Sequence, residues 1–143
     1  MFTVRELMSS EVFTLKTSDT LDLARSIMQL ARIRHIPIVD NEDMFVGLVT
    51  HRDILEATVS RLADIDRATE SELYANIPIQ EIMRTDLRTV SPKTSLREAA
   101  EILYKHKYGC LPVLEDGLLV GIITEADFLN LTISLMDALE PQG

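Results

Sequence analysis

With 143 residues, 46% of them hydrophobic and 26% charged, the chain has the composition of a globular protein that forms one domain or two small units sharing a core. Its net charge of −9 argues against nucleic acid as a partner, because binding a phosphate backbone requires a basic surface. A single cysteine, an N-terminus unlike a signal peptide and the lack of an apolar stretch of roughly 20 residues argue against a disulfide framework and a membrane span, and predict a cytoplasmic protein.

The first half of the chain predicts the order strand, helix, strand, strand, helix. A short extended run precedes a segment whose apolar residues have the spacing of an amphipathic helix. Two β-branched strands joined by a polar turn follow, and then a helix with one apolar face. In chain order these elements are residues 12–15, 21–32, 36–39, 45–50 and 51–62.

The second half predicts the same order. Its first helix is expected to begin at Ser95, whose hydroxyl accepts from the third helical amide while Glu98 reaches back to complete a capping box. Its last helix carries a stripe of leucine, methionine and other apolar residues. In chain order the elements are residues 89–90, 96–103, 111–114, 118–124 and 125–139.

The two halves are copies of one another. Residues 47–53, Gly-Leu-Val-Thr-His-Arg-Asp, return at residues 121–127 as Gly-Ile-Ile-Thr-Glu-Ala-Asp. The offset is 75 residues near the N-terminus, as from Met8 to Met83, and 74 residues at the returning segment. A fixed internal offset of this kind indicates a duplicated structural unit.

We therefore expect a first repeat over residues 1–63, a polar connector over residues 64–78 and a second repeat over residues 79–143. Neither repeat has much apolar area of its own, so the two copies are predicted to bury a shared core. The predicted fold class is α/β (α+β type), with two β-α-β-β-α repeats packed with pseudo-two-fold symmetry as one domain.

Each Gly-x-x-Thr-x-x-Asp segment has a structural and a functional interpretation, and the residues leave both open. In the structural one, Thr50 caps the following helix, Asp53 complements the helix dipole, and Gly47 permits another backbone to approach the strand closely. In the functional one, the free helix amides bind phosphate and the carboxylate accepts the hydroxyls of a ribose. No GxxxxGK[ST] sequence occurs, so triphosphate hydrolysis is not predicted.

Basic residues near these segments favour a small anionic ligand despite the acidic total. They are Arg32, Arg34, His35, His51 and Arg52 in the first half, and Lys105, His106 and Lys107 in the second. Other chemistry finds little support. Gly109 is expected to break the helix between His106 and Cys110, so an inert thiol is favoured over a nucleophile. The histidines lack metal-ligand spacing and no carboxylates pair across an identifiable pocket, so we predict no catalytic residue and no metal site.

Taken together, these motifs resemble a tandem pair of CBS (cystathionine-β-synthase-type) domains, known as a Bateman module. The resemblance covers residues 4–139 and rests on the lead-ins that end in Met8 and Met83, the strands Ile-Pro-Ile-Val and Leu-Pro-Val-Leu, and both Gly-x-x-Thr-x-x-Asp segments. No further domain is recognisable, so the chain is similar to small stand-alone bacterial CBS-domain proteins that are often labelled as acetoin-utilisation proteins.

The resemblance implies a regulatory, non-catalytic module that binds AMP, ADP, ATP or S-adenosylmethionine in clefts between the repeats, as an energy sensor with no required cofactor. It also implies a homodimer formed through the helices after each segment, and an unknown regulated protein. The alternative is a dimerisation or scaffold module with vestigial clefts. An enzyme whose chemistry the sequence does not display is a third, weaker interpretation.

By position, the resemblance assigns a set of ligand-binding residues to each cleft. The first set is Lys16, Thr17, His35, Ile36, Pro37, Thr50, His51, Arg52 and Asp53, and the second is Ser91, Cys110, Leu111, Pro112, Thr124 and Asp127. The sets differ in charge, because His-Arg follows the first threonine and Glu-Ala the second. Phosphorylated adenosine is therefore predicted to bind more tightly at Asp53 than at Asp127, with Lys105 and Lys107 partly compensating the second cleft.

Overall fold

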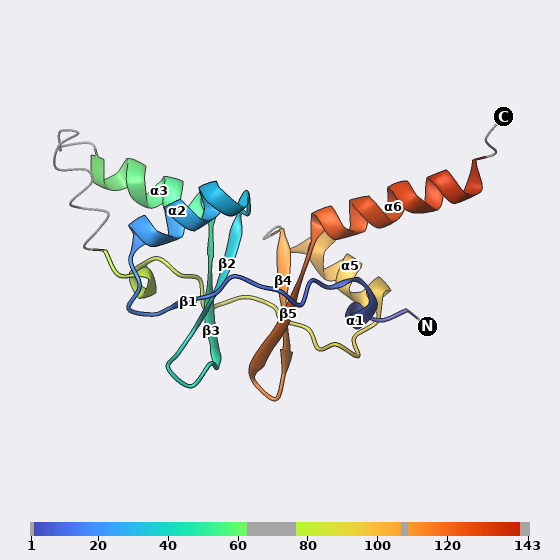
Figure 1. Ribbon diagram of the computed structural model, residues 1–143, viewed down its shortest axis with the longest axis horizontal. Coiled ribbons are helices and arrows are strands. Elements are labelled where there is room, and N and C mark those ends of the chain that lie inside the picture. The colour runs from blue at the N-terminus through green and yellow to red at the C-terminus, as the bar shows by residue number, and fades with distance from the viewer. Residues whose placement is uncertain (1, 63–76, 107–108, 141–143) are drawn as a thin grey trace. The chain divides into compact units, whose positions relative to one another are not determined.

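The computed structural model describes residues 2–62, 77–106 and 109–140 (Figure 1). The helices are α1 (Val4–Leu7), α2 (Leu21–Ala31), α3 (His51–Leu62), α5 (Leu96–Lys105) and α6 (Glu125–Leu139), with a 3-10 turn η1 (Ile79–Glu81). The strands are β1 (Leu15–Lys16), β2 (His35–Val39), β3 (Phe45–Thr50), β4 (Cys110–Glu115) and β5 (Leu118–Thr124). The predicted mixture of helices and strands is confirmed, while the predicted connector lies almost wholly outside the described residues.

The chain forms two compact units, and their boundaries cut across the sequence repeats. One unit combines residues 1–11 with residues 88–143, and the other comprises residues 12–87. We call them the β4–β5 unit and the β1–β3 unit. Each unit thus holds the strands and helices of one repeat together with the short lead-in of the other repeat. The predicted repeat boundaries describe the sequence duplication and stay predictions.

The β1–β3 unit contains a three-stranded sheet in the order β1-β2-β3, with β1 parallel to β2 and β2 antiparallel to β3. Helix α2 begins after Thr20, whose hydroxyl accepts a hydrogen bond from the amide of Leu23, and it ends at Arg32 in a left-handed conformation. Helices α2 and α3 lie next to each other in this unit (Figure 1). The buried core consists of Leu15, Leu21, Ala24, Met28, Ile36, Ile38, Val49, Ile54, Ile77 and Ile79.

The β4–β5 unit contains a two-stranded antiparallel sheet. The first strand predicted for this half is reduced to a single parallel bridge between Val90 and Val113. The Ser95 hydroxyl accepts from the Glu98 amide at 3.1 Å, which confirms the predicted start of α5. The buried core consists of Val4, Val90, Ala99, Ile102, Leu103, Leu111, Val113 and Ile123.

In the β1–β3 unit, the lead-in of the second repeat crosses strand β3 at its glycine. Arg84 and Leu48 exchange both backbone hydrogen bonds, at 2.7 and 2.9 Å. A Cβ added to Gly47 would lie 2.8 Å from the sulfur of Met83 and 3.0 Å from the backbone oxygen of Arg84. The close backbone approach predicted for this glycine is confirmed, and the approaching segment is identified.

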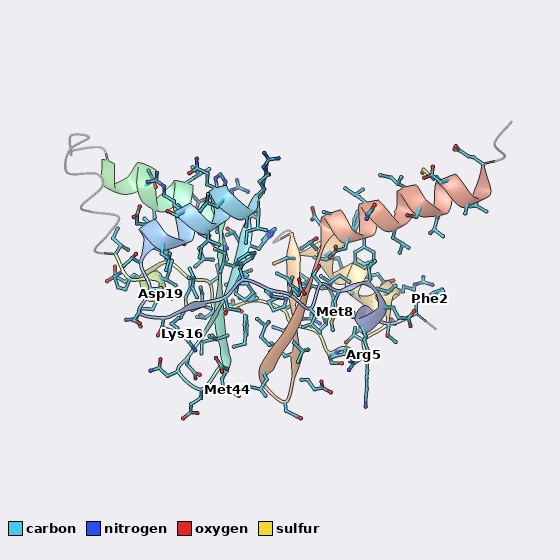
Figure 2. All side chains as sticks on the ribbon, viewed as in Figure 1. Phe2, Arg5, Met8, Lys16, Asp19 and Met44 are labelled. Atoms are coloured by element: carbon cyan, nitrogen blue, oxygen red, sulfur yellow. The ribbon has the colours of Figure 1, made fainter. Side chains whose placement is uncertain are left out.

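The β4–β5 unit repeats this crossing with the N-terminal lead-in. Ser9 and Ile122 exchange both backbone hydrogen bonds at 2.9 Å. A Cβ added to Gly121 would lie 2.7 Å from the sulfur of Met8, which Figure 2 labels beside strands β4 and β5, and 2.8 Å from the backbone oxygen of Ser9. The lead-in methionines and the segment glycines recur together in the sequence because they touch in the structure.

Replacing Gly47 or Gly121 by alanine should destabilise the protein, because a backbone oxygen and a methionine sulfur would both have to move. We expect each change to lower the free energy of unfolding by about 1–3 kcal/mol, the usual cost of overpacking, measured by urea denaturation. Ser26→Ala on the exposed face of α2 is the control, with an expected change within about 0.5 kcal/mol. Glycine variants as stable as this control would contradict the tight crossing.

Candidate functional site

The first strand-to-helix junction, residues 47–53, connects β3 to α3 (Figure 1). The amide of Asp53 donates to Thr50 Oγ1 at 3.1 Å, and the amide of Thr50 donates to Asp53 Oδ2 at 3.0 Å. Both residues are only 8% exposed. The structural interpretation, in which Thr50 caps the helix, is therefore confirmed, and it uses one of the two carboxylate oxygens of Asp53.

The other carboxylate oxygen of Asp53 is held by Arg84 from the crossing lead-in. Arg84 Nε donates to Asp53 Oδ1 at 2.9 Å, and Nη2 of the same guanidinium lies 2.9 Å from that oxygen. The Arg84 side chain is 41% exposed, so the pair lies where the buried interior meets solvent. Both oxygens of Asp53 thus have protein partners.

The second junction, residues 121–127, connects β5 to α6 and has the same cap. The amide of Asp127 donates to Thr124 Oγ1 at 3.3 Å, while the amide and hydroxyl of Thr124 approach Asp127 Oδ2 at 2.8 and 3.2 Å. Within the described part of the chain, no protein group bonds to Asp127 Oδ1. Both residues are half-buried rather than buried.

One difference between the repeats accounts for this contrast. The offset of 75 residues that aligns Met8 with Met83 also aligns Ser9 with Arg84. Both residues form the same backbone bridge to their strand, to Ile122 and Leu48 respectively. The sequence interpretation missed Arg84, although the repeat itself carries the signal: a long cation replaces a serine next to the aligned methionines.

A cavity of about 700 Å³ lies between α2 and α3, beside the first junction. Its polar lining includes Arg25, Arg32, Arg34 and His51, and its apolar lining includes Ile54. The volume is in the range of small-molecule sites. The three arginines among the lining residues concentrate positive charge at this cavity, although the chain as a whole is acidic. The sequence interpretation named Arg32, Arg34 and His51 but not Arg25, which lies on α2 about two turns before Arg32.

The first predicted set of binding residues only partly gathers at this junction. His35 is the register partner of Thr50 across β2 and β3. His51 and Arg52 are exposed, and Arg52 Nε lies 3.6 Å from Glu56. Lys16, by contrast, is bound to the hairpin turn, where Nζ lies 2.9 Å from Asp40 O and from Asp43 Oδ1. Of the remaining members, Thr17 is half-buried, and Ile36 and Pro37 are buried in β2.

The second predicted set shows the same division. Cys110 is the register partner of Thr124 across β4 and β5, so the start of β4 adjoins the junction. Leu111 and Pro112 follow Cys110 as buried residues of β4. Ser91 is exposed, and its amide donates to the Thr94 hydroxyl at 3.0 Å.

The Cys110 side chain is fully buried, at 0% exposure. Burial, and secondarily the negative charge of Glu125, raises the pKa of the Cys110 thiol to about 12. The thiolate is the nucleophilic form of cysteine, so this thiol is unreactive at neutral pH. The burial expected of an inert thiol is thus observed, and the low reactivity of Cys110 stays a prediction.

Cys110 should consequently resist alkylation in the folded protein at pH 8. With a pKa of about 12, roughly one thiol in ten thousand is ionised at that pH, and burial also blocks access. We expect modification by an aromatic disulfide reagent to proceed only at the rate of unfolding, and to be complete within seconds to minutes in guanidinium chloride. Rapid, stoichiometric labelling without denaturant would contradict a buried, protonated thiol.

Arg84→Ala should lower the free energy of unfolding by about 1–2 kcal/mol, because it leaves the buried Asp53 carboxylate without its cation. This value lies between the ~0–1 kcal/mol of exposed pairs and the ~3–5 kcal/mol of broken buried pairs. Ser9→Ala, at the aligned position of the second junction, should cost almost nothing. Both variants are compared by urea denaturation, and equal losses would show that the Arg84–Asp53 pair adds nothing to stability.

Residues 2–62, 77–106 and 109–140 contain no group of three His, Cys, Asp or Glu side chains placed to hold a metal ion. In the same part of the chain, no helix has both the length and the apolar character required to cross a membrane.

The family model of the CBS domain matches the chain twice, over residues 4–60 and 79–134. A CBS domain-containing protein of Dictyostelium discoideum is 31% identical over 141 residues, which are 98% of this chain and 97% of the relative. Several other curated relatives are longer, and the chain spans between 22% and 42% of three of them.

Two solved structures show the same fold. The crystal structure of a putative acetoin utilization protein (AcuB) from Vibrio cholerae is 38% identical, with a TM-score of 0.81 over 99% of both chains. The CBS domain pair of protein MJ0100, solved in complex with 5′-methylthioadenosine and S-adenosyl-L-methionine, is 25% identical, with a TM-score of 0.77 over 91% of this chain and 98% of that one. The resemblance inferred from the sequence motifs is confirmed.

Proposed function

Because the chain belongs to the CBS-domain family, we propose that it is a regulatory module that binds an adenosine-containing ligand at its two Thr–Asp junctions. The observation that carries this proposal is the second junction, where Asp127 Oδ1 accepts no hydrogen bond from the described residues while Oδ2 is used by the cap. Two hydroxyls of a ribose are suitable donors for such an oxygen. The MJ0100 pair, which is similar in fold and binds two adenosine compounds, supports the same ligand class.

Each junction would bind the ligand by combining three elements. The carboxylate accepts the ribose hydroxyls, the helix N-terminus and nearby cations attract phosphate, and the start of the neighbouring strand contacts the base. At the first junction the cations are His51 and the arginines that line the cavity between α2 and α3. AMP, ADP, ATP and S-adenosylmethionine are the candidate ligands.

The module would act by linkage rather than by catalysis. A ligand that prefers one arrangement of the protein shifts the population toward it and changes the affinity for a regulated partner by the same coupling free energy. The buried, protonated Cys110 removes the one thiol that could serve as a nucleophile. We expect the module to act in the cytoplasm and without a required cofactor.

A dimerisation or scaffold role is the second candidate, and helix α6 favours it. None of its residues is buried, and it exposes Leu129, Ile133, Leu135, Met136 and Leu139. Exposed apolar residues in such number indicate a surface that another molecule covers. A homodimer through the helices that follow the junctions is compatible with ligand binding, whereas a scaffold alone would leave both junctions empty.

A true ligand should raise the melting temperature of the protein. At about 100 times its dissociation constant it adds roughly 2.7 kcal/mol to the free energy of unfolding, a shift of several degrees for a chain of this size. The measurement is differential scanning fluorimetry with AMP, ATP and S-adenosylmethionine, with inosine monophosphate as a control for the base. No shift with any adenosine compound would favour the scaffold role.

The two junctions should differ in their preference for phosphate. Because His-Arg follows Thr50 and Glu-Ala follows Thr124, Asp53→Ala should weaken AMP binding more than Asp127→Ala does, by about tenfold for a difference of one charge-assisted contact. Isothermal titration calorimetry on the two single variants compares the affinities and the number of sites. Loss of AMP binding in Asp127→Ala alone would contradict this ranking.

A further inference from the structure

The Arg84–Asp53 pair stands where the proposed function requires a ribose to bind. Asp53 Oδ2 accepts from the Thr50 amide as part of the helix cap, whereas Oδ1 takes no part in the cap and is the oxygen we assign to a ligand. That oxygen is contacted by two nitrogens of one guanidinium, each at 2.9 Å. The two contacts occupy both lone pairs of Oδ1, so a ribose hydroxyl that binds to this oxygen has to displace at least one of them, and Arg84 has to move.

Withdrawal of the guanidinium carries an electrostatic cost that depends on the ligand. Arg84 is 41% exposed, so its side chain has room to move toward solvent. The released cation would stay near the first turn of α3, which already presents His51 and adjoins a cavity lined by three arginines. Adding a free positive charge to this region is unfavourable, whereas an anion placed there is stabilised by all of these groups.

We propose that Arg84 determines the ligand specificity of the first junction, by making ribose binding at Asp53 conditional on a phosphate that takes up the released guanidinium. This inference rests on the proposed function and deepens it. A neutral adenosine binds at the first junction only at the cost of the ion pair. A phosphorylated adenosine replaces that pair with a contact between guanidinium and phosphate, a favoured partner of arginine.

The second junction provides the internal comparison. Ser9 occupies the position aligned with Arg84 and makes the same backbone bridge, and within the described residues Asp127 Oδ1 has no protein partner to displace. Its first turn carries Glu125 in place of His51. The second junction therefore accepts uncharged or cationic adenosine compounds without this penalty, so the two sites of one chain differ in ligand class as well as in affinity.

The test uses calorimetric titration of AMP and of adenosine into the full chain, with one junction silenced at a time. In an Asp127→Ala background, AMP should bind at least about tenfold more tightly than adenosine. Adding Arg84→Gln should increase the affinity for adenosine. The ratio of the AMP affinity to the adenosine affinity should then fall by about tenfold, the effect of one charge-assisted contact. Arg84→Lys retains the cation and should preserve most of the preference for AMP.

The reciprocal test installs the pair at the second junction. In an Asp53→Ala background, Ser9→Arg should lower the affinity for adenosine by about tenfold and the affinity for AMP by less. Ser9→Ala is the matched control and should change the affinity for neither ligand. A merely structural role of Arg84 would weaken both ligands in parallel, and could not tighten adenosine.

The outcomes separate the two proposals. If the unmodified protein binds none of AMP, adenosine, ATP and S-adenosylmethionine, the proposed function fails and the role of Arg84 fails with it. If it binds S-adenosylmethionine but neither AMP nor adenosine, the role of Arg84 alone is overturned. If the protein binds AMP and adenosine but Arg84→Gln leaves the ratio of affinities unchanged or weakens both equally, the role of Arg84 alone is overturned. Circular dichroism at the titration temperature confirms that each variant remains folded.

Discussion

The close crossing of a lead-in segment over a strand glycine is the contact on which each junction depends. At Gly47 and Gly121 a side chain as small as a methyl group would collide with a methionine sulfur and a backbone oxygen. The absent Cβ allows two backbone hydrogen bonds to form beside it, and these fix the residue after each methionine against the strand. At the first junction this places the long side chain of Arg84 within reach of the Thr–Asp cap that ends the strand.

This arrangement separates the part of the junction that is constant from the part that varies. The threonine and the aspartate build the same reciprocal cap twice, and the glycine permits the same crossing twice. The residue after the methionine is not needed for the cap, so it can differ between the copies, and Arg84 and Ser9 do differ. One duplicated scaffold thus carries two electrostatic environments, because the charge of the neighbouring segment differs between the copies in addition to the charges within the junctions themselves.

The sequence was sufficient for those features that depend on local patterns. Strand β3, with its bounds Phe45–Thr50, and the helix that begins at His51 follow directly from an apolar run that ends in a threonine cap. The strand predicted near Val90 is present only as one bridge. A run of two residues has no periodicity, so the sequence could not show whether a full strand forms there. Likewise, the buried state of Ile36 and Pro37 could not be told from a ligand-facing position, since strands buried on both faces do not alternate.

Arg84 escaped the sequence interpretation for a different reason. Its contact with Asp53 joins residues that are 31 positions apart, and no local motif encodes such a distance. Exchange of the lead-ins between the repeats creates the contact, and the duplication alone does not reveal that exchange. An alignment of the repeats contains the substitution of serine by arginine, but its meaning emerges only when Met83 is known to lie on Gly47.

Under the proposed function, the exchange would also couple a ligand at the first junction to the rest of the chain. The chain passes from the β1–β3 unit to the β4–β5 unit between Leu87 and Arg88, shortly after Arg84, and in the opposite direction between Glu11 and Val12, shortly after Ser9. Each junction is therefore packed against the segment that leads into the other unit. A ligand that displaced Arg84 from Asp53, as we propose, would alter the contacts of one such segment directly, so its binding free energy would differ between arrangements of that segment. Differential binding of this kind is what linkage requires of a sensor, and no separate path through the two cores is needed.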